Sequence, residues 1–371
     1  MKHNKNMKIK NIFNYLIFTV SFLGLLIISL LLMYHAGFIS NVYQNHFEKQ
    51  LIWIFIGFFI LFIFRFIPIH KLYHFSFFLY CFNVFLLILV LFIGKNVNGS
   101  TAWLDFKYFN FQPSELMKLS YSLFLAYFIS SKRFRDWKEE LLFLLQIFLI
   151  FLIPTILIFL EPDTGAILFL GFITLVLLWN SRLRKRWFFI LGIFLCAIVG
   201  LFFYLYFYQK DLLINFIGTS FFYRVDRLFQ FRNGMQIENA LIAMGSAPLY
   251  QFSLTKTGIY IPEGPTDFIF ALSSNVFGII GNIIILICYF LCDISLIYFL
   301  KKVKKRQEKL FFLSFLTIFF ISQFINISMN LGLLPIIGIT LPFLSYGGSS
   351  MIVSFLYLAI LIYSQESFRL S

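Results

Sequence analysis

The sequence predicts an all-α polytopic membrane protein with about ten transmembrane helices, and its composition and its apolar runs both lead to that prediction. Of its 371 residues, 60% are hydrophobic, 55 are Phe and 12% are charged. Soluble domains are roughly half apolar and about a quarter charged. Several apolar runs exceed the roughly 18–20 residues that an α-helix needs to cross a bilayer. These runs do not alternate polar with apolar residues, which excludes a transmembrane β-barrel.

The expected spans follow the apolar runs in chain order. They cover about 11–34, 51–66, 72–94, 115–131, 141–160, 165–180, 187–209, 267–300, 310–334 and 350–364. The run 267–300 is longer than a bilayer requires, so we expect it to tilt, to kink near Gly278 and Gly281, or to project from the membrane. Polar loops are expected at 35–50 and 95–114, and the longest segment between spans is 210–266. Without a repeat or a separate soluble segment, residues 1–371 form a single membrane domain.

Basic residues are distributed unevenly over these loops. The N-terminus and the alternate loops hold about two thirds of the 30 Lys and Arg residues, and the positive-inside rule makes that side cytoplasmic. Both termini are then cytoplasmic, and the loop 210–266 is extracellular. The net charge of +14 is spread over short loops, so it predicts no nucleic-acid partner and leaves membrane lipids as the surroundings. Most of the 16 acidic residues fall on the outer side, where we expect the chemistry.

Cysteine and histidine do not predict a metal site in this chain. The four cysteines lie inside apolar runs, which is typical of small core residues. His70 and His74 are four residues apart but lack a third ligand nearby.

A carboxylate stands where the span 267–300 begins. It belongs to the stretch Tyr-Ile-Pro-Glu-Gly-Pro-Thr-Asp at 260–267, in which two prolines and a glycine predict a turn. We expect Thr266 to cap the helix and Asp267 to lie in its first turn, where the helix dipole favours the ionised form. Asp267 can then accept a proton as a general base, or it can serve only as a helix cap.

Four motifs in the outer loops occur together in a characteristic order. They are Gln-Pro-Ser-Glu at 112–115, Pro-Asp-Thr-Gly at 162–165, Pro-Glu-Gly-Pro-Thr-Asp-Phe-Ile-Phe-Ala at 262–271, and Leu-Pro-Phe-Leu-Ser-Tyr-Gly-Gly-Ser-Ser at 341–350. In order and spacing these motifs resemble the SEDS family of membrane proteins, which includes FtsW, RodA and SpoVE. The resemblance covers nearly the whole chain.

The resemblance implies a ten-helix peptidoglycan glycosyltransferase in the bacterial cytoplasmic membrane. Such an enzyme polymerises lipid II into β-1,4 glycan at the outer face, in cell division or cell-shape maintenance, beside a class B penicillin-binding protein. It implies that Asp267 is the catalytic base. Two alternatives remain: a transporter that flips lipid II, for which polar residues inside spans such as Lys118, Asn275 and Asp293 are suited, and a catalytically weak scaffold for a penicillin-binding protein.

The residues expected to bind substrate lie in outer loops or at the outer ends of spans. They are Glu115, Lys118, Asp163, Arg224, Arg227, Gln236, Glu263, Ser345, Gly347 and Gly348. The spacing of Glu115 and Lys118 suits either a structural ion pair or a pair that lines the site. Arg224 and Arg227 suit a pyrophosphate or a lipid headgroup.

Other residues of this set also have two readings. Asp163 can cap the span 165–180 instead of contacting substrate, and Glu263 can stabilise its turn. Backbone N–H groups near Gly347 and Gly348 can bind pyrophosphate, or the glycines can serve close packing. A divalent cation, Mg²⁺ or Mn²⁺, would help to neutralise a pyrophosphate, although the sequence contains no clear metal motif.

The chain departs from the family pattern at several positions, among them two pairs of adjacent residues. Thr101 and Ala102 replace basic residues before Trp103, and Asn275 and Val276 replace an acidic pair. These replacements put the subgroup and the catalytic strength in doubt more than the fold.

Overall fold

The computed structural model describes residues 2–97, 100–106, 109–219, 222, 226, 234–253 and 258–364. A helix coincides with each expected span: α1 (Lys2–Ile39), α2 (His46–Phe64), α4 (Ser76–Ile93), α5 (Pro113–Ser131), α6 (Trp137–Leu160), α7 (Thr164–Trp179), α8 (Arg186–Tyr208), α12 (Ile269–Leu300), α13 (Arg306–Asn330) and α14 (Gly348–Ser364). In the described part of the chain, 7 helices are long and apolar enough to cross a membrane, and α7 and α14 are shorter apolar helices. The protein is therefore a multi-pass membrane protein, and the count of about ten spans stays a prediction.

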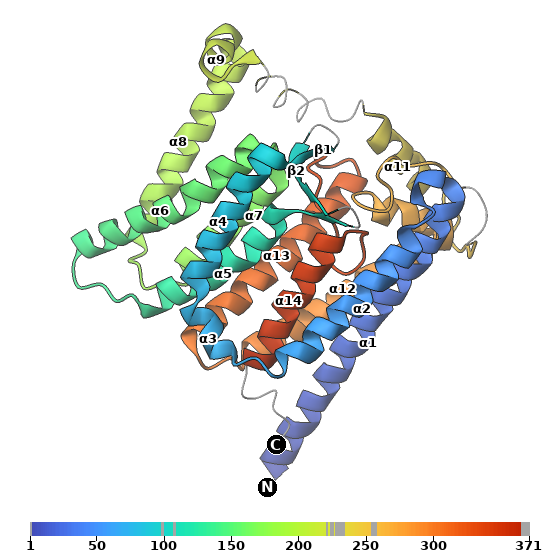
Figure 1. The fold of residues 1–371 in the computed structure, drawn as a ribbon, viewed down its shortest axis with the longest axis horizontal. Helices are drawn as coiled ribbons and strands as arrows, with labels where there is room; N and C mark the ends of the chain where they lie inside the picture. The colour runs from blue at the N-terminus through green and yellow to red at the C-terminus, as the bar shows by residue number, and fades with distance from the viewer. Residues whose placement is uncertain are drawn as a thin grey trace.

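The helices form one bundle in which α13 lies among α5, α7, α12 and α14 (Figure 1). Helix α1 packs along α12, α2 packs along α14, and α4 packs along α5. Such a bundle is expected, because in lipid each span must satisfy its backbone hydrogen bonds internally. Parts of the central helices surround the site described below.

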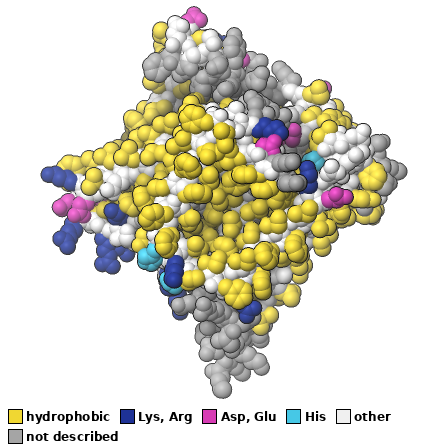
Figure 2. Space-filling model, viewed as in Figure 1, with side chains coloured by type: hydrophobic (Ala, Val, Ile, Leu, Met, Phe, Trp, Pro, Cys, Tyr) yellow, Lys and Arg dark blue, Asp and Glu magenta, His cyan; other side chains and the backbone are white. Residues whose placement is uncertain are grey.

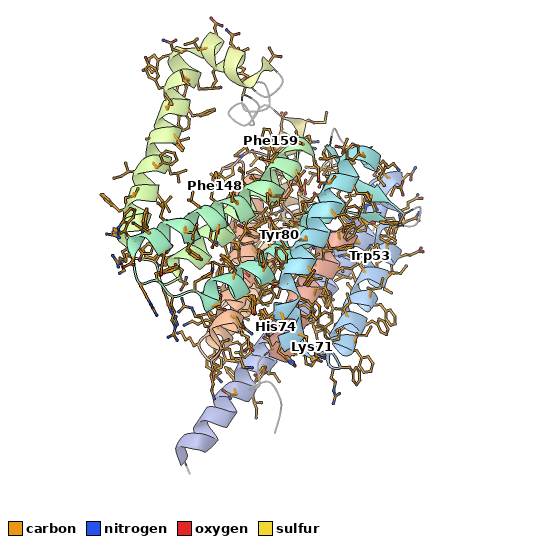
Figure 3. The ribbon with its side chains drawn as sticks, turned by 60° about the vertical axis from the view of Figure 1, so that its left-hand side comes forward. Trp53, Lys71, His74, Tyr80, Phe148 and Phe159 are labelled. Carbon is orange, nitrogen blue, oxygen red and sulfur yellow. The ribbon has the colours of Figure 1, made fainter. Side chains whose placement is uncertain are left out.

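The surface of the bundle is apolar over most of the face seen in Figure 2, and Lys and Arg side chains gather near its edges. Exposed aromatic side chains such as Phe148 and Phe159 lie along α6, whereas Lys71 and His74 belong to the short helix α3 (Ile69–His74) at one end of the bundle (Figure 3). An exposed apolar side chain costs little where the neighbouring phase is lipid. This surface therefore fits a bilayer and does not by itself mark a binding site.

The three expected loops contain more regular structure than the sequence suggested. In 35–50, α1 continues to Ile39, a 3₁₀ turn η1 spans Asn41–Tyr43, and α2 begins at His46. Two polar side chains of this segment, His35 and Gln50, are completely buried in the protein, which the sequence did not indicate. The loop 95–114 contains a small antiparallel sheet of β1 (Lys95–Val97), β2 (Ser100–Asp105) and β3 (Asn110–Phe111). The segment 210–266 includes helices α9 (Lys210–Ile217) and α11 (Met235–Gly245).

Helix α12 is broken at Gly278, which is one of the three alternatives expected for the long run 267–300. Gly278 has a φ of +67°, and a Cβ there would lie 2.4 Å from the carbonyl oxygen of Pro248. The loop that follows α11 satisfies the backbone at the break: Ile279 N–H donates to Pro248 (3.1 Å) and Ile280 N–H to Leu249 (3.1 Å). The part of α12 that follows Asp267 is thus joined to the loop after α11 by backbone hydrogen bonds.

Candidate active site

The turn that carries Asp267 is organised around one backbone carbonyl. The carbonyl of Glu263 accepts hydrogen bonds from the N–H groups of Thr266 (3.2 Å), Asp267 (3.0 Å) and Phe268 (3.1 Å). Glu263 adopts a left-handed conformation with φ +55°, which is unusual for a residue other than glycine. The Thr266 hydroxyl lies 3.0 Å from the Glu263 carboxylate oxygen Oε2, to which it donates.

This turn corrects two expectations about Asp267. Helix α12 begins at Ile269 with Phe268 at its N-cap position, so Thr266 does not cap the helix and Asp267 precedes its first turn. The turn around Glu263 ends before the helix starts, which sets Asp267 at the edge of a cavity. The helix dipole therefore does not dominate its ionisation. The pKa of Asp267 is raised to about 7, mainly by burial and in addition by the negative charges of Glu263 and Asp163.

Two asparagines of α13 hold the backbone of Asp267. The side-chain amides of Asn326 (2.8 Å) and Asn330 (3.0 Å) donate to the Asp267 carbonyl. Asn326 also donates to Ile339 O (2.7 Å), and Asn330 Oδ1 accepts the N–H of Ala271 (2.9 Å). Sequence reasoning missed both residues. Their spacing of four on one face of an apolar span was the available signal, because polar groups inside a membrane usually have a partner.

The loop before α14 is tied to the same turn. The Ser345 hydroxyl donates to Thr266 O (2.6 Å), and the Tyr346 N–H donates to Pro265 O (2.8 Å). Ser345 is buried and does not line the cavity next to Asp267. Its hydroxyl proton is already used to connect two segments of the backbone, and its expected role in binding substrate stays a prediction.

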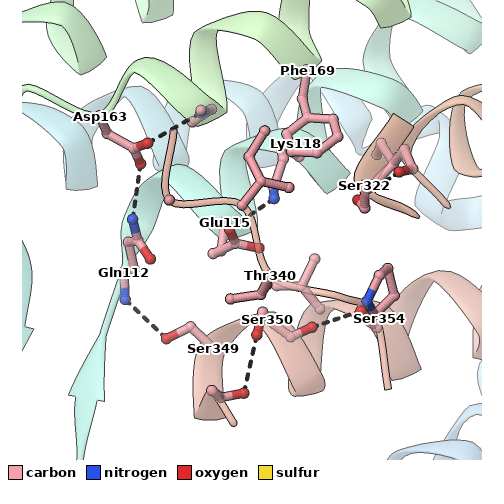
Figure 4. Close-up of a pocket in the computed structure, with 18 of the residues that line it drawn as sticks. Gln112, Glu115, Lys118, Asp163, Phe169, Ser322, Thr340, Ser349, Ser350 and Ser354 are labelled. Carbon is pink, nitrogen blue, oxygen red and sulfur yellow. Dashed lines mark hydrogen bonds and ion pairs between the residues drawn. The ribbon is translucent and has the colours of Figure 1, made fainter. Parts of the chain in front are cut away.

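A cavity of about 400 Å³ opens beside this turn, between the ends of α5, α7, α13 and α14 (Figure 4). Six residues named from the sequence line it: Glu115, Lys118, Asp163, Glu263, Asp267 and Gly347. Trp103, Gln112, Ser322 and Ser354 also line it, and none of these was named. Apart from residues that carry a hydroxyl group, the residues of α13 and α14 that line the cavity are apolar.

Glu115 and Lys118 form an enclosed ion pair on α5. The Lys118 Nζ lies 2.7 Å from Glu115 Oε1, with side-chain exposures of 8% and 16%. The same ammonium lies 4.6 Å from the centre of the Phe169 ring. Lys118 is the one lysine or arginine among the described residues of the cavity wall. It therefore supplies positive charge where a phosphate group could enter, while Glu115 keeps that charge paired in the meantime.

Asp163 both caps a helix and shapes the cavity wall. Its Oδ1 accepts the N–H of Ala166 (3.1 Å) at the start of α7. Its Oδ2 accepts hydrogen bonds from Gln112 Nε2 (2.8 Å) and Ser114 Oγ (2.6 Å), which belong to the approach to α5. Three donors hold this carboxylate, so its contribution is to join α5 to α7 at the cavity rim.

Like Ser345, the named residues Gln236 and Gly348 are absent from the cavity wall, whereas two named arginines are not described. Arg224 and Arg227 lie outside the residues that the structure describes. Gln236 lies in α11 and is absent from the cavity wall. Gly348 packs against α2, since a Cβ on it would lie 2.6 Å from Cε2 of Trp53. The close-packing reading is therefore the correct one for Gly348, because Trp53 occupies the space that a side chain would need.

The positions that depart from the family pattern have uncharged internal partners. Asn275 Nδ2 donates to Ile259 O (2.9 Å), and the Asn275 carbonyl accepts from Gln251 Nε2 (3.1 Å). Val276 and Ala102 are buried. Asn275 and Val276 are absent from the cavity wall, so their replacement of acids leaves the immediate surroundings of Asp267 unchanged.

The side chains at the cavity do not assemble a metal site. Among the described residues, no group of three or more His, Cys, Asp or Glu side chains is arranged to hold a metal ion. The two carboxylate oxygens of Asp163 accept hydrogen bonds from three protein donors, and Glu115 is paired with Lys118. The residues present do not fit a divalent cation, and we derive no step that uses one.

Comparison with known proteins agrees with these features. A family model described as cell cycle protein, FtsW/RodA/SpoVE, matches residues 10–369. The chain is 34% identical to the probable peptidoglycan glycosyltransferase FtsW of Wigglesworthia glossinidia brevipalpis, over 99% of this chain and 98% of the relative. It is 30% identical to the protein of the same name from Coxiella burnetii, over 92% and 93% of the two chains.

Solved structures show the same fold. One similar chain belongs to a peptidoglycan synthase complex that coordinates polymerization and crosslinking, with a TM-score of 0.74, 22% identity, and coverage of 94% of this chain and 98% of that one. Another is the rod shape determining protein RodA of Thermus thermophilus, with a TM-score of 0.68, 22% identity, and coverage of 95% and 97%. The match of the family model to nearly the whole sequence, together with this shared fold, shows that the chain belongs to the FtsW/RodA/SpoVE (SEDS) family.

Proposed function

We propose that this protein is a peptidoglycan glycosyltransferase that polymerises lipid II into β-1,4 glycan strands, in cell division or cell-shape maintenance. The observation that carries the proposal is the position of Asp267, a carboxylate at the rim of a cavity with a pKa raised to about 7. A general base is most effective when its pKa lies near the working pH. The names of the FtsW relatives support the same activity.

The proposed reaction transfers a sugar from one lipid-linked chain to another. Asp267 takes the proton of the acceptor's sugar hydroxyl, and the hydroxyl oxygen forms a bond to the anomeric carbon of the donor. The bond from that carbon to the pyrophosphate oxygen breaks, and undecaprenyl pyrophosphate leaves with the electron pair. The ammonium of Lys118, which lines the same cavity, stabilises the negative charge on the leaving group.

We also propose that residues away from Asp267 contact the substrate. Arg224 and Arg227 would bind pyrophosphate from the long outer segment through their paired N–H donors. The backbone at Gly347, which lines the cavity just before α14, is suited to an anion because the N–H groups of a first helical turn lack partners within their own helix. Gln236 would act from outside the described cavity, as a contact to the extended glycan.

The proposal also includes a location and a partner. The site would face the outer side of the bacterial cytoplasmic membrane. In the expected topology, Asp267 lies on the same side as the loops that contain few Lys and Arg residues. A class B penicillin-binding protein would crosslink the product. This pairing is supported by the similarity to a chain from a complex that coordinates polymerization and crosslinking.

The test is a polymerisation assay with purified protein and lipid II, with and without its penicillin-binding partner. Wild type should form glycan polymer, and Asp267→Ala should reduce the rate about 100-fold or more, since a general base contributes about that much. Glu48→Ala is the matched control, because Glu48 is an exposed carboxylate on α2 outside the cavity wall and should leave the rate unchanged.

Two outcomes would replace this proposal by one of its alternatives. Lipid II translocation across vesicles that survives Asp267→Ala, without polymer from any pairing, would indicate a transporter. Absence of both activities, with normal complex formation, would indicate a scaffold.

A further inference from the structure

A stripe of polar and aromatic side chains, formed by the first turns of α2 and the preceding 3₁₀ turn η1, faces the segments that hold Asp267. Tyr43, His46, Gln50 and Trp53 follow one another at intervals of three or four residues, which places them on one face. The neighbouring residues Leu51 and Ile52, which lie off this face, are exposed, with 47% and 51% of their surface accessible. The stripe is therefore the face of α2 that meets the protein.

Each side chain of this stripe touches the Asp267 region or the loop before α14. The Tyr43 ring stacks with that of Tyr260, with 6.5 Å between centroids. The His46 ring lies 4.0 Å from that of Tyr346. Trp53, labelled in Figure 3, packs against Gly348. The stripe thus contacts the segment that leads to Asp267, at Tyr260, and the segment that leads into α14, at Tyr346 and Gly348.

Gln50 makes the most specific of these contacts. It is completely buried, and its Nε2 donates to Ser29 Oγ of α1 (2.9 Å) and to the carbonyl of Ser345 (3.2 Å). The Ser29 hydroxyl in turn donates to Leu344 O (2.6 Å). The Ser345 carbonyl can only accept, and the Ser29 hydroxyl proton is already donated to Leu344 O, so Gln50 must present its NH₂ group to both Ser345 O and Ser29 Oγ.

The carbonyl oxygen of the Gln50 side-chain amide indicates that Gln50 does more than stabilise the fold. Gln50 Oε1 is buried and has no hydrogen-bond partner among the described residues. Leaving a buried carbonyl oxygen unsatisfied is unfavourable, and an apolar side chain of the same shape would avoid it. An amide at this position is therefore best explained by what its donors hold in place.

A short chain of hydrogen bonds connects Gln50 to the proposed base. Gln50 holds the carbonyl of Ser345, and the hydroxyl of the same serine donates to the carbonyl of Thr266 (2.6 Å), the residue before Asp267. The Tyr346 N–H adds a parallel connection to Pro265 O (2.8 Å). On the opposite side the asparagines of α13 hold the Asp267 carbonyl, so the turn is fixed from two directions.

We propose that Gln50 is a positioning residue for catalysis, which acts through Ser345 and Thr266 to hold Asp267 at the cavity. This inference rests on the proposed glycosyl transfer. Gln50 itself does not line the cavity and touches no substrate there. Its removal should displace the base by a fraction of an ångström and admit water to the turn, without changing the residues that bind the substrate.

The test compares Gln50→Met with wild type in the lipid II polymerisation assay. Met keeps the volume of the side chain and removes both the donor and the unsatisfied acceptor, so the protein should fold, with a modest loss of thermal stability because the Ser345 carbonyl loses its donor. We expect kcat to fall about tenfold with KM within about twofold, because geometry is lost rather than binding. Ser29→Ala, which removes the contact to Leu344, should give a smaller loss in the same direction.

The pH profile separates positioning from a general structural role. Burial is the main cause of the raised pKa of Asp267. If the turn admits water in Gln50→Met, the acidic limb of the kcat profile should move to lower pH by about half a unit or more. Asn83→Leu is the control: Asn83 is a buried amide of α4 that donates to Leu79 O of its own helix (3.0 Å). Its pH profile should match that of wild type.

The outcomes keep this inference apart from the proposed function. An unchanged kcat and pH profile in Gln50→Met, or the same changes in Asn83→Leu, would overturn the positioning role. If wild type makes no polymer, the proposed function fails instead. Hydrogen exchange then decides the role of Gln50: faster exchange of backbone amides in 263–268 and 341–346 in Gln50→Met supports it, and unchanged exchange refutes it.

Discussion

Helices α13 and α8 have similar lengths and play opposite structural roles. An 18-residue stretch of α13 has a mean hydropathy of 2.0, and 72% of that stretch is buried. The corresponding stretch of α8 has a higher mean hydropathy of 2.7, and 0% of it is buried. In Figures 1 and 3, α8 leads away from the bundle towards α9, while α13 runs through its centre. The less hydrophobic helix is the central one because it carries Ser322, Gln323, Asn326 and Asn330, which find protein partners. Hydropathy identifies a span, and the polar residues within it indicate whether it faces protein or lipid.

The largest expected difference between the two helices is in stability. Phe311 of α13 is completely buried and stacks with Tyr357, with 5.3 Å between ring centroids. Phe311→Ala should lower the free energy of unfolding by about 3 kcal/mol through lost packing. Phe194 of α8 is 63% exposed, and Phe194→Ala should cost under about 0.5 kcal/mol. Unfolding in mixed detergent micelles measures both, and equal losses would mean that α8 packs against protein in solution.

A second expected effect is the pH dependence of the site at the end of α13. Asp267 must be ionised to accept a proton, and its pKa is raised to about 7. The rate should therefore increase with pH up to about 7 and fall about tenfold per unit below it, to about one hundredth at pH 5. Initial rates of polymer formation between pH 5 and 9 test this. A rate that stays constant down to pH 5 would show that another group is the base.

A smaller change in activity should distinguish the polar face of α13 from the lipid face of α8. Asn326→Leu removes the hydrogen bonds to the carbonyls of Asp267 and Ile339, so kcat should fall about tenfold by displacement of the base. Cys196→Leu on α8 is the control, since Cys196 is exposed. Comparable losses in the two variants would contradict the positioning role of α13.

The smallest expected effect concerns two glycines. A Cβ at Gly192 of α8 would meet nothing within 4 Å, so Gly192→Ala should stabilise the protein by about 0.5–1 kcal/mol through helix propensity. Gly278→Ala of α12 should destabilise it, because a φ of +67° and the nearby carbonyl of Pro248 leave no room for a methyl group. Melting temperatures in detergent give the sign of each change, and a destabilised Gly192→Ala would indicate a partner on α8.

Much of the fold could be predicted from the sequence because bilayer crossing depends on local composition. Each expected span coincides with a helix, and the break at Gly278 was one of the alternatives expected from an excess of length and a glycine pair. The wrong boundaries fall where polar residues face protein. Residues 35–50 look like a loop in sequence, yet Gln50 is buried, and α2 begins at His46.

The residues of the candidate site that belong to family motifs could be predicted from the sequence. The residues that reach the site from helices outside these motifs were missed. Asp267, Glu115 and Lys118 were expected at one site, and they line one cavity. Ser345 lies in a motif but acts on the backbone of Thr266. Asn326, Asn330 and Gln50 lie outside the motifs, because their role depends on which backbone carbonyl the packed helices bring within reach.

The sequence by itself determined the membrane class, the positions of the helices and, through its motifs, the family and the candidate base. The tertiary structure decided that Asp267 precedes its helix, that its pKa is raised by burial rather than lowered by a helix dipole, and that α13 and the loop before α14 both bond to its turn. The physical reason is the range of the interactions. Hydropathy and turn propensity act over a few neighbouring residues, whereas burial and side-chain hydrogen bonds join Gln50, Asp267 and Asn326, which meet only after the helices have packed.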